Sequence, residues 1–287
     1  MADVAVLGLG NIGSAVARAF LAAGQQTVVW NRTSSRCGPL ASVGADVAPS
    51  PRSAVESAPV VIASVLDYRV LQETLADRVD LAGRTLINLS WGTTEEALEL
   101  AELVSTQGGD YLEGGVLCRP EAIGSSNGDI LYSGPSDLLE KVHPLLCALG
   151  PVHYVGAHIT RANALALSLG SIFYAGVLSF LEAVAYAQRL GIGADILAPL
   201  IRIPLNLAAT TADASVEQIK RQNFTGSEAS NAVHAAGLAS VSQAFASAGI
   251  EHRLTDAMVS YFDSAARLGL SDLEVSALLR VVSATDN

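Results

Sequence analysis

The sequence predicts an α/β protein in which an N-terminal doubly wound sheet and an all-helical C-terminal domain are joined by a long helix. Three observations support this fold class. β-rich runs alternate with helical patterns through the first half of the chain, 20 uncharged residues follow from Ala162 to Leu181, and Ala-rich helical periodicity dominates after Gly156. Alternating strands and helices favour a parallel sheet covered on both faces. The expected parts are an α/β domain at 1–158, an interdomain helix at 159–190 and a helical domain at 191–287.

Seven short apolar runs are the expected strands of the N-terminal sheet. Helical segments such as Ile12–Ala23 and Thr94–Ser105 separate these runs, and Thr93 with Glu96 three residues on has the spacing of a capping box. No convincing strand follows Gly156, so the second half is expected to be helical. The seven strands are Val4–Leu9, Thr27–Trp30, Pro59–Val65, Thr85–Leu89, Tyr111–Val116, Ile130–Tyr132 and His153–Val155.

Composition excludes several classes of function. Lys and Arg number 17 against 28 Asp and Glu, which gives a formal charge of −11 and argues against binding to a nucleic-acid backbone. The three cysteines Cys37, Cys118 and Cys147 are odd in number and lack metal-ligand spacing, so neither a disulfide framework nor a metal site is expected. Because no export signal precedes the first strand and the thiols suit a reducing compartment, we expect a cytoplasmic protein.

The uncharged segment Ala162–Leu181 is long enough to span a bilayer. It contains Asn163 and three serines, however, and no basic cluster flanks it. We therefore interpret it as a helix of a protein without a membrane span, buried between domains or between subunits.

A glycine-rich motif, Gly8-Leu9-Gly10-Asn11-Ile12-Gly13, directly follows the first strand and opens the first helix. In a Rossmann dinucleotide-binding turn, Gly8 allows the tight turn, Gly10 lets the backbone approach a pyrophosphate, and Gly13 lets helix and strand pack closely. The helix N-terminus then attracts the phosphates. The alternative is a structural turn that binds nothing. The expected cofactor contacts here are Gly8, Gly10, Asn11 and Ile12.

The loop after the second strand indicates which dinucleotide binds. Asn31, Arg32, Thr33 and Arg36 occur there without any Asp or Glu. A carboxylate in this loop would accept hydrogen bonds from a ribose 2′-hydroxyl, whereas arginines bind a 2′-phosphate. The sequence therefore favours NADPH over NADH, with these four residues as contacts. The alternative is a pair of solvated surface arginines.

Two further loops, Ser64–Tyr68 and Asn88–Thr93, follow expected strands at the edge where open α/β sheets bind ligands. We expect Val65, Leu66 and Ser90 to contact the cofactor. Asp67 is a candidate to contact cofactor or substrate, and its alternative role is to cap the following helix.

These motifs, together with segments further along the chain, resemble the NADPH-dependent imine reductases. These enzymes belong to the wider β-hydroxyacid dehydrogenase and 6-phosphogluconate dehydrogenase-like superfamily. The resemblance covers nearly the whole chain and is most specific from Asn88 to Gly134. It implies a homodimer with interlocked helical domains, in which each site lies between two subunits. The segments that carry it are Asn88–Thr93, Gly114–Gly124, Ile130–Gly134 and the helix after Tyr154-Val155-Gly156.

The sequence departs from the hydroxyacid branch of this superfamily. That branch uses a catalytic lysine near the start of the long helix, but the two lysines here, Lys141 and Lys220, lie elsewhere in the sequence. The Ser-Gly-Gly of that branch is replaced by Cys118-Arg119-Pro120. Hydroxyacid oxidation by the usual mechanism is therefore disfavoured.

The sequence also departs from many imine reductases, which place an Asp or Tyr proton donor where Asn163 stands here, or Ala166 if the register shifts by one turn. Neither residue is an acid. We expect Asn163 to orient the substrate nitrogen, and the candidate proton donors are Tyr174, three helical turns further on, and then Asp67. Reductive aminases use Asn at the position of Trp91, whose indole here suggests a flat or cationic substrate or, alternatively, packs between domains.

The resulting hypothesis is an NADPH-dependent oxidoreductase that reduces the C=N bond of a small imine or iminium, cyclic or aromatic, to an amine. Hydride attack on a protonated or quaternary nitrogen needs orientation and water exclusion rather than a strong acid. Two alternatives remain, a hydroxyacid-type dehydrogenase with a rearranged site and an NADP-binding protein without turnover. The expected substrate pocket consists of Trp91, Cys118, Arg119, Ala166 and His234.

Overall fold

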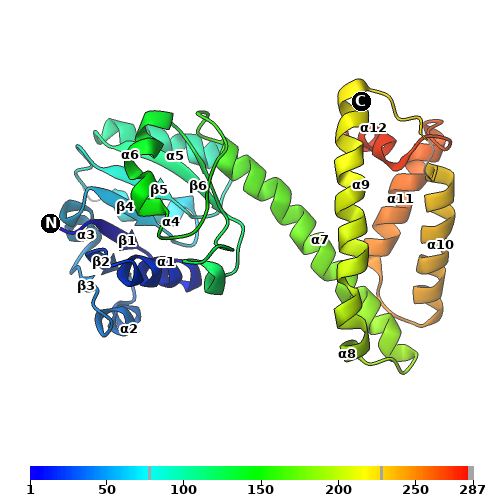
Figure 1. Cartoon of the computed structure of the whole chain (residues 1–287), viewed down its shortest axis with the longest axis horizontal. Helices are drawn as coiled ribbons and strands as arrows, with labels where there is room; N and C mark the ends of the chain where they lie inside the picture. The colour runs from blue at the N-terminus through cyan, green and yellow to red at the C-terminus, as the bar shows by residue number, and fades with distance from the viewer. Residues whose placement is uncertain (77–78, 227–228, 284–287) are drawn as a thin grey trace. The chain divides into compact units, whose positions relative to one another are not determined.

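The computed structural model describes residues 1–76, 79–226 and 229–283, which form two compact units, Met1–Gly170 and Ser171–Asn287. The first unit is an α/β layer structure (Figure 1). Its strands are β1 Val4–Leu7, β2 Thr27–Trp30, β3 Asp46–Val47, β4 Val60–Ala63, β5 Thr85–Asn88, β6 Asp110–Val116, β7 Ile130–Ser133 and β8 Val152–Tyr154. Its helices are α1 Asn11–Ala22, η1 Ser34–Arg36, α2 Gly38–Ala41, α3 Pro51–Ser57, α4 Tyr68–Leu75, α5 Thr94–Thr106, η2 Pro120–Ala122, α6 Ser136–Leu146 and the start of α7 Arg161–Arg189.

The sheet has the strand order β3-β2-β1-β4-β5-β6-β7-β8. Neighbouring strands run parallel except at one place, where β6 and β7 are antiparallel with Gly114 opposite Tyr132. The expectation of a purely parallel sheet is therefore wrong at this pair. The physical reason is that the connection from β6 to β7 holds only the short η2, and a parallel crossover needs a longer connection, usually a helix.

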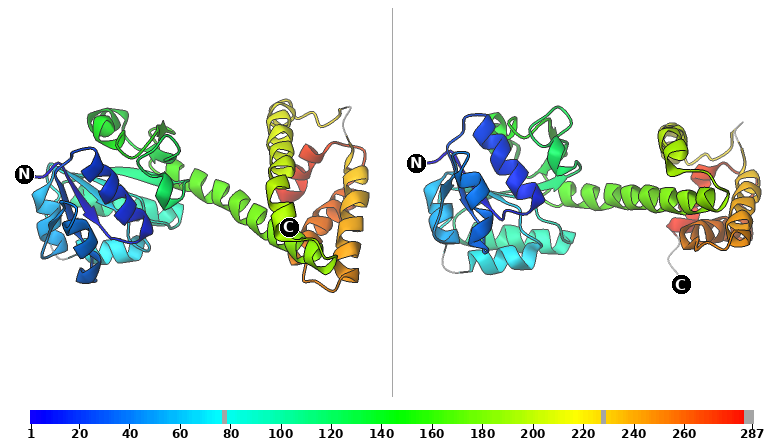
Figure 2. Two further views of the ribbon diagram at one scale, coloured as in Figure 1. Left: turned by 60° about the horizontal axis from the view of Figure 1, so that its bottom comes forward. Right: turned by 90° about the horizontal axis from the view of Figure 1, so that it is seen from below.

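Apolar side chains on both faces of the sheet hold the first unit together. Val6, Val29 and Ile62 face a core that includes Phe20 of α1, and Leu7 and Leu86 face a second core that includes Leu100 of α5. The central strands β1 and β4 are buried along their whole length, as expected for parallel strands covered by helices on both sides. The views in Figure 2 show helices on the two faces of the sheet.

The local predictions for the first unit agree with the structure to within about two residues at each end. The seven expected strands are confirmed, and only the two-residue β3 was missed. The capping box is also confirmed, since Thr93 Oγ1 accepts from Glu96 N and Glu96 Oε2 accepts from Thr93 N.

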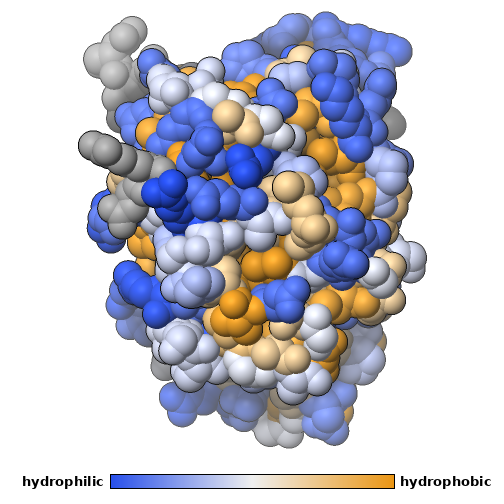
Figure 3. Space-filling view, turned by 90° about the vertical axis from the view of Figure 1, so that its left-hand side faces the viewer, coloured by the Kyte–Doolittle hydropathy of each residue, from blue (hydrophilic) through white to orange (hydrophobic). Residues whose placement is uncertain are grey.

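Hydrophilic side chains cover much of the face of the molecule shown in Figure 3.

The second unit is helical throughout its described residues, as expected. Glu182 in α7 accepts hydrogen bonds from the backbone of Leu254 and from the hydroxyl and backbone of Thr255, and so caps the start of α11. The elements that follow α7 are α8 Ala194–Leu197, η3 Ala198–Leu200, α9 Arg202–Arg221, α10 Asn231–Ser247, α11 Arg253–Arg267, η4 Val275–Leu278 and α12 Leu279–Val282.

The helix α7 is both long and apolar over its 29 residues. Its mean hydropathy reaches 1.9, and by length and composition it could cross a membrane. Within this single chain it is not buried as expected, since only 6% of its most apolar stretch is covered. Ile172, Phe173 and Tyr174 are each more than 60% exposed. The expected burial against a second chain stays a prediction.

Candidate active site

The glycine motif forms the turn that connects β1 to α1. Gly8 has a φ of +89°, and a Cβ there would lie 2.3 Å from the carbonyl oxygen of Ser64. A Cβ at Gly13 would lie 1.9 Å from the carbonyl oxygen of Gly8, so helix and turn pack as closely as the motif requires. A Cβ at Gly10, by contrast, would meet no described heavy atom within 4 Å beyond its neighbours in the chain. The turn thus leaves room beside the N-terminus of α1, where a pyrophosphate would bind.

The loop after β2 is hydrogen-bonded to this glycine turn. Asn31 Oδ1 accepts from the backbone N–H of Leu9 at 2.9 Å, and Asn31 Nδ2 donates to the carbonyl of Thr33 at 3.0 Å. Arg36 donates to the carbonyl of Leu9 at 3.4 Å. The side chain of Arg32, in the same loop, is exposed. The amide of Asn31 therefore holds the two loops together, and the guanidinium group of Arg36 lies beside the turn that fits a dinucleotide.

The loops after β4 and β5 meet next to the glycine turn. Ser90 Oγ accepts from the backbone N–H of Val65 at 3.1 Å, and Asp67 and Trp91 form an isolated parallel bridge. Asp67 also accepts from the backbone N–H of Val70 at 2.8 Å and thereby caps α4. The capping interpretation of Asp67 is therefore observed, while its proposed contact with a ligand stays a prediction. Leu66, in the loop after β4, is 80% exposed.

Beside these loops lies a narrow cavity with room for the centre of about one water molecule, roughly 10 Å³. It brings together four of the predicted residues, Ser90, Trp91, Asn163 and Ala166. The helix approaches the sheet closely here because Gly115 has no side chain, and a Cβ there would lie 2.7 Å from Cβ of Ala166. The cavity is lined by Leu89, Ser90, Trp91, Gly114, Gly115, Val116, Asn163, Ala166 and Leu167.

Asn163 lies in the first turn of α7 and is 5% exposed. Its Nδ2 donates to the hydroxyl of Tyr68 at 3.0 Å and to the carbonyl of Gly92 at 2.9 Å. Its Oδ1 is buried without a hydrogen-bond partner among the described residues. A buried amide oxygen without a partner is costly, and a water molecule or a ligand that donates a hydrogen bond would satisfy it.

Behind Asn163 lies a buried carboxyl group, Glu113 in β6. The hydroxyl of Tyr68 donates to Glu113 Oε1 at 2.8 Å, Asn88 Nδ2 donates to the same oxygen at 3.3 Å, and the hydroxyl of Tyr111 donates to Oε2. Burial raises the pKa of Glu113 from 4.5 to about 8, against the lowering effect of these three donors. Burial likewise raises the pKa of Tyr68. The cluster is therefore a hydrogen-bonded chain from Glu113 through Tyr68 to Asn163.

The buried cluster of Glu113, Tyr68 and Tyr111 behind Asn163 was not predicted from the sequence. One signal was available, since Glu113 interrupts the strand Tyr111–Val116 in a position where a charged residue is rarely buried without partners. The partners could not be found in this way, because Tyr68 and Asn163 are 95 residues apart in sequence.

Other predicted pocket residues do not line this cavity. Cys118 packs against the first apolar core, and burial raises the pKa of its thiol. Arg119 is exposed at the start of η2, 3.7 Å from Glu121. In the helical unit, His234 lines a separate open cavity of about 450 Å³ together with Leu207 of α9 and Ser276 of η4. Tyr174 is 63% exposed and stacks edge-on against Phe173, with 5.3 Å between ring centroids.

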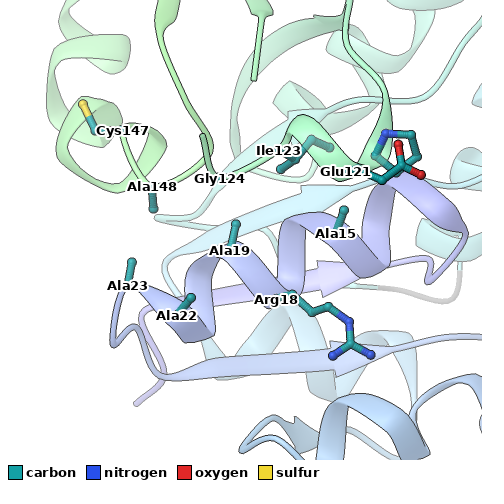
Figure 4. Close-up of a pocket in the computed structure, with 11 residues that line it drawn as sticks. Ala15, Arg18, Ala19, Ala22, Ala23, Glu121, Ile123, Gly124, Cys147 and Ala148 are labelled. Carbon is teal, nitrogen blue, oxygen red and sulfur yellow. The ribbon is translucent and has the colours of Figure 1, made fainter. Parts of the chain in front are cut away.

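The largest of the cavities described in the first unit, about 590 Å³, lies along the side of α1 rather than at its N-terminus (Figure 4). Ala15, Ala19 and Ala22 of α1 line it on one side, and Ile123 and Ala148 line it on the other. Its lining is mostly small apolar residues, with Arg18 and Glu121 at its edge, so it lacks the groups that a dinucleotide needs. Among the residues that the structure describes, no three His, Cys, Asp or Glu side chains gather as they would around a metal ion.

Comparison with known proteins gives two family matches that together cover nearly the whole chain. Residues 3–157 match the NAD binding domain of 6-phosphogluconate dehydrogenase, and residues 159–284 match the C-terminal domain of NADPH-dependent reductive aminase-like proteins. The chain is 35% identical over 184 residues to an NADPH-dependent reductive aminase of Aspergillus oryzae. That alignment spans 63% of this chain and 62% of the relative.

Solved structures match over almost the full length. An imine reductase from Pseudomonas sp. superposes with a TM-score of 0.94 at 30% identity, covering 98% of this chain and 99% of the other. A reductive aminase from Aspergillus terreus, in complex with NADPH and ethyl levulinate, gives a TM-score of 0.94 at 29% identity with the same coverage. The resemblance expected from the motifs is confirmed: the chain belongs to the imine reductase and reductive aminase family, whose members join a 6-phosphogluconate dehydrogenase-type NAD binding domain to a reductive aminase-like C-terminal domain.

Proposed function

We propose that this protein uses NADPH to reduce the C=N bond of a small cyclic or aromatic imine or iminium to an amine. The observation that carries this proposal is the continuous row of contacts from Gly8 through Val65 and Ser90 to the cavity beside Asn163. It links a turn that fits a pyrophosphate to a narrow space beside Asn163 that has room for a single polar atom of a substrate. NADPH supplies a hydride to the carbon of the C=N bond.

The residues around the cavity suit a substrate that needs little proton transfer from the protein. None of the described lining residues is an acid or a base near neutral pH. Once the substrate nitrogen is protonated or quaternary, the carbon accepts hydride readily, and the protein has to orient the substrate and exclude water. Asn163 is the residue we assign to orient the nitrogen, and Tyr174 is the candidate donor where a neutral imine reacts.

The first turns of α7 disfavour the hydroxyacid-type alternative. The cation in this region, Arg161, donates to the carbonyl of Val155 at 3.3 Å rather than toward the cavity. The two lysines of the chain lie on α6 and α9, at Lys141 and Lys220. No lysine or arginine is therefore among the described residues that line the cavity, where a cation would polarise an oxygen that becomes an alkoxide.

The exposed apolar surface of α7 supports a homodimer with interlocked helical domains. Contiguous apolar surface of this kind marks an interaction site. A second copy is the occupant we propose, and Cys118, Arg119 and His234 would then contribute to a site shared by two chains. The exposed apolar side chains of the helix are Leu165, Leu167, Leu169, Ile172, Phe173, Tyr174, Val177, Leu178 and Leu181. Covering this helix by a second chain also removes the need for a membrane, which fits a cytoplasmic enzyme.

The test is incubation of the purified protein with NADPH and a panel of cyclic imines, iminium salts and ketone–amine mixtures, followed by cofactor absorbance and amine analysis. We expect turnover of imines and iminium salts. The same protein is offered NADP⁺ with 3-hydroxyacids. Oxidation of 3-hydroxyacids would instead support the dehydrogenase alternative, and tight NADPH binding without turnover of any compound would support the non-catalytic alternative.

A further inference from the structure

The side-chain amide of Asn163 is fixed in one of its two possible orientations. Both hydrogens of Nδ2 are used, one on the hydroxyl oxygen of Tyr68 and one on the carbonyl of Gly92. If the amide rotated by half a turn, Oδ1 would face the Gly92 carbonyl, and two acceptors would stand opposite each other. The carbonyl of Gly92 therefore determines which end of the amide is left for the cavity.

Tyr68 also stabilises this orientation of the Asn163 amide. Its ring is fully buried and its hydroxyl hydrogen is directed to Glu113 Oε1, so its oxygen is an acceptor toward Asn163. The backbone of Gly92 packs closely against this ring, since a Cβ at Gly92 would lie 2.1 Å from Tyr68 Cδ2. Oε1 of Glu113 is an acceptor whether or not the carboxyl group carries a proton on Oε2. The chain from Glu113 to Asn163 thus has one direction of donation.

The atom left over is Oδ1 of Asn163, which is buried, has no partner among the described residues and belongs to a side chain that lines the cavity. An amide oxygen accepts hydrogen bonds and cannot donate them. It stabilises a group that brings a hydrogen, and it stabilises a positively charged N–H most, because charge-assisted hydrogen bonds are the strong ones.

We propose that Asn163, positioned by Tyr68 and Gly92, presents its carbonyl oxygen to the substrate nitrogen, so that the site selects protonated imines bearing an N–H over fully substituted iminium ions. This inference rests on the proposed function and specifies its substrate class. The proton balance closes without an acid from the protein. The substrate enters with its proton, hydride forms the new C–H bond, the π electrons move to nitrogen, and a neutral amine results.

The test compares two probes of the same ring shape, a protonated five-membered cyclic imine and its N-methyl iminium. The variants are Asn163→Leu, which removes the acceptor, and Tyr68→Phe, which removes one of its two supports. The matched control is Tyr111→Phe, which also removes a donor from Glu113 but lies outside the contacts of Asn163. Asn163→Leu should lower the ratio of kcat/KM for the N–H probe to that for the N-methyl probe by roughly 10- to 100-fold.

Tyr68→Phe should lower the same ratio by a smaller factor, and Tyr111→Phe should leave the ratio unchanged. Equal losses on both probes in Asn163→Leu would overturn the proposal and make Asn163 a packing residue. A weakened affinity for NADP⁺ with an unchanged probe ratio would also overturn it, and would place Oδ1 against the cofactor. If Asn163→Leu does not fold, the comparison of Tyr68→Phe with Tyr111→Phe decides.

A binding measurement separates this inference from the proposed function. Calorimetry on the NADP⁺-loaded protein compares pyrrolidinium, which has N–H groups, with N,N-dimethylpyrrolidinium, which has none. The wild-type protein should prefer pyrrolidinium, and Asn163→Leu should lose that preference. This result stands even if neither imine probe is turned over. A wild-type protein without the preference, including one that binds neither ion, overturns the proposal whatever its activity.

Discussion

The hydroxyl of Tyr68 donates a hydrogen bond to Oε1 of Glu113 at 2.8 Å and so joins the first residue of α4 to the middle of β6. Both side chains are fully buried. The contact supports Asn163 from behind, and it also places a titratable group in the interior of the fold. Two separate consequences follow, one for the orientation of a ligand-binding amide and one for stability against pH.

We predict that the protein becomes less stable between about pH 5 and pH 8 because of Glu113. Its pKa is raised from 4.5 to about 8 in the folded protein, mainly by burial. Between these two values the folded state holds one more proton than the unfolded chain, so stability is greatest below pH 4.5 for this group and falls as pH rises toward 8. The slope for one proton is at most about 1.4 kcal/mol per pH unit.

Urea unfolding at pH 5, 6.5 and 8 and at one protein concentration checks this prediction. The variant Glu113→Gln should have a flatter pH dependence than the wild type. The control Glu121→Gln, at an exposed position, should follow the wild type. A difference between Glu113→Gln and the wild type that is constant over the three pH values would contradict the prediction.

The preference for NADPH should depend on Arg32. If its guanidinium binds the 2′-phosphate, Arg32→Ala removes a charge-assisted contact of about 1.5–3 kcal/mol and weakens NADPH far more than NADH. Fluorescence titration with both cofactors measures this. Arg69→Ala, which removes an exposed arginine paired with Glu73, is the control and should change neither affinity. An unchanged NADPH/NADH ratio in Arg32→Ala would refute the assignment.

Two glycines of the turn should respond to alanine in opposite ways. Gly13→Ala places a Cβ 1.9 Å from the carbonyl of Gly8 and should lower the melting temperature, because helix and turn must separate. Gly10→Ala meets no described atom within 4 Å and has an ordinary φ of −69°, so the fold should tolerate it. Its affinity for NADPH should fall nonetheless, since the methyl group occupies the space for the pyrophosphate. A Gly10→Ala protein with wild-type NADPH affinity would place the phosphates elsewhere.

The apolar surface of α7 should hold two chains together. We expect a dimer at micromolar concentration by light scattering, and we expect Ile172→Glu to shift the mass toward the monomer, because a charge would be buried in the interface. Ile172 is 68% exposed in the single chain, so the substitution should not disturb its own fold. Leu98→Glu, at a half-exposed site on α5, is the control. A folded wild-type protein that is strictly monomeric would reject the shared site.

Tyr174 should matter only where a proton is needed. As the donor for a neutral imine, its loss in Tyr174→Phe should reduce turnover by roughly 10²- to 10⁴-fold. A quaternary iminium should be reduced at close to the wild-type rate by the same variant. Since Tyr174 is largely exposed in the single chain, phenylalanine should keep its ring contact with Phe173. Equal losses on both substrates would make Tyr174 a packing residue.

Local features of the sequence predicted the glycine turn, the capping box at Thr93 and the strands β1, β2, β4 and β5. These depend on a few neighbouring residues and on hydrophobic runs. The two-residue β3 is too short to show a pattern. The antiparallel pairing of β6 with β7 had a signal in the sequence, the lack of a crossover helix between Val116 and Ile130, but the alternating pattern as a whole outweighed it.

The hydrogen bonds of the site were harder to predict from the sequence than the fold was. The resemblance to imine reductases indicated Asn163 as a site residue, but the direction of its amide depends on Tyr68 and Gly92, which are distant in sequence. Likewise, Glu113 is buried because strands pair on both sides of β6. Such contacts arise from the tertiary fold and leave no periodic trace in the chain.

Every hydrogen bond of the Asn163 side chain is made to a residue of Met1–Gly170. The amide that we propose to bind the N–H of a charged substrate is therefore positioned by residues of the first unit alone, which includes the first turn of α7. In a chimera that carries the C-terminal half of a relative, the range of accepted molecular shapes could change while the demand for an N–H persisted. Evolution, or an engineer, can then vary the size of the substrate and its protonation state as two separate traits.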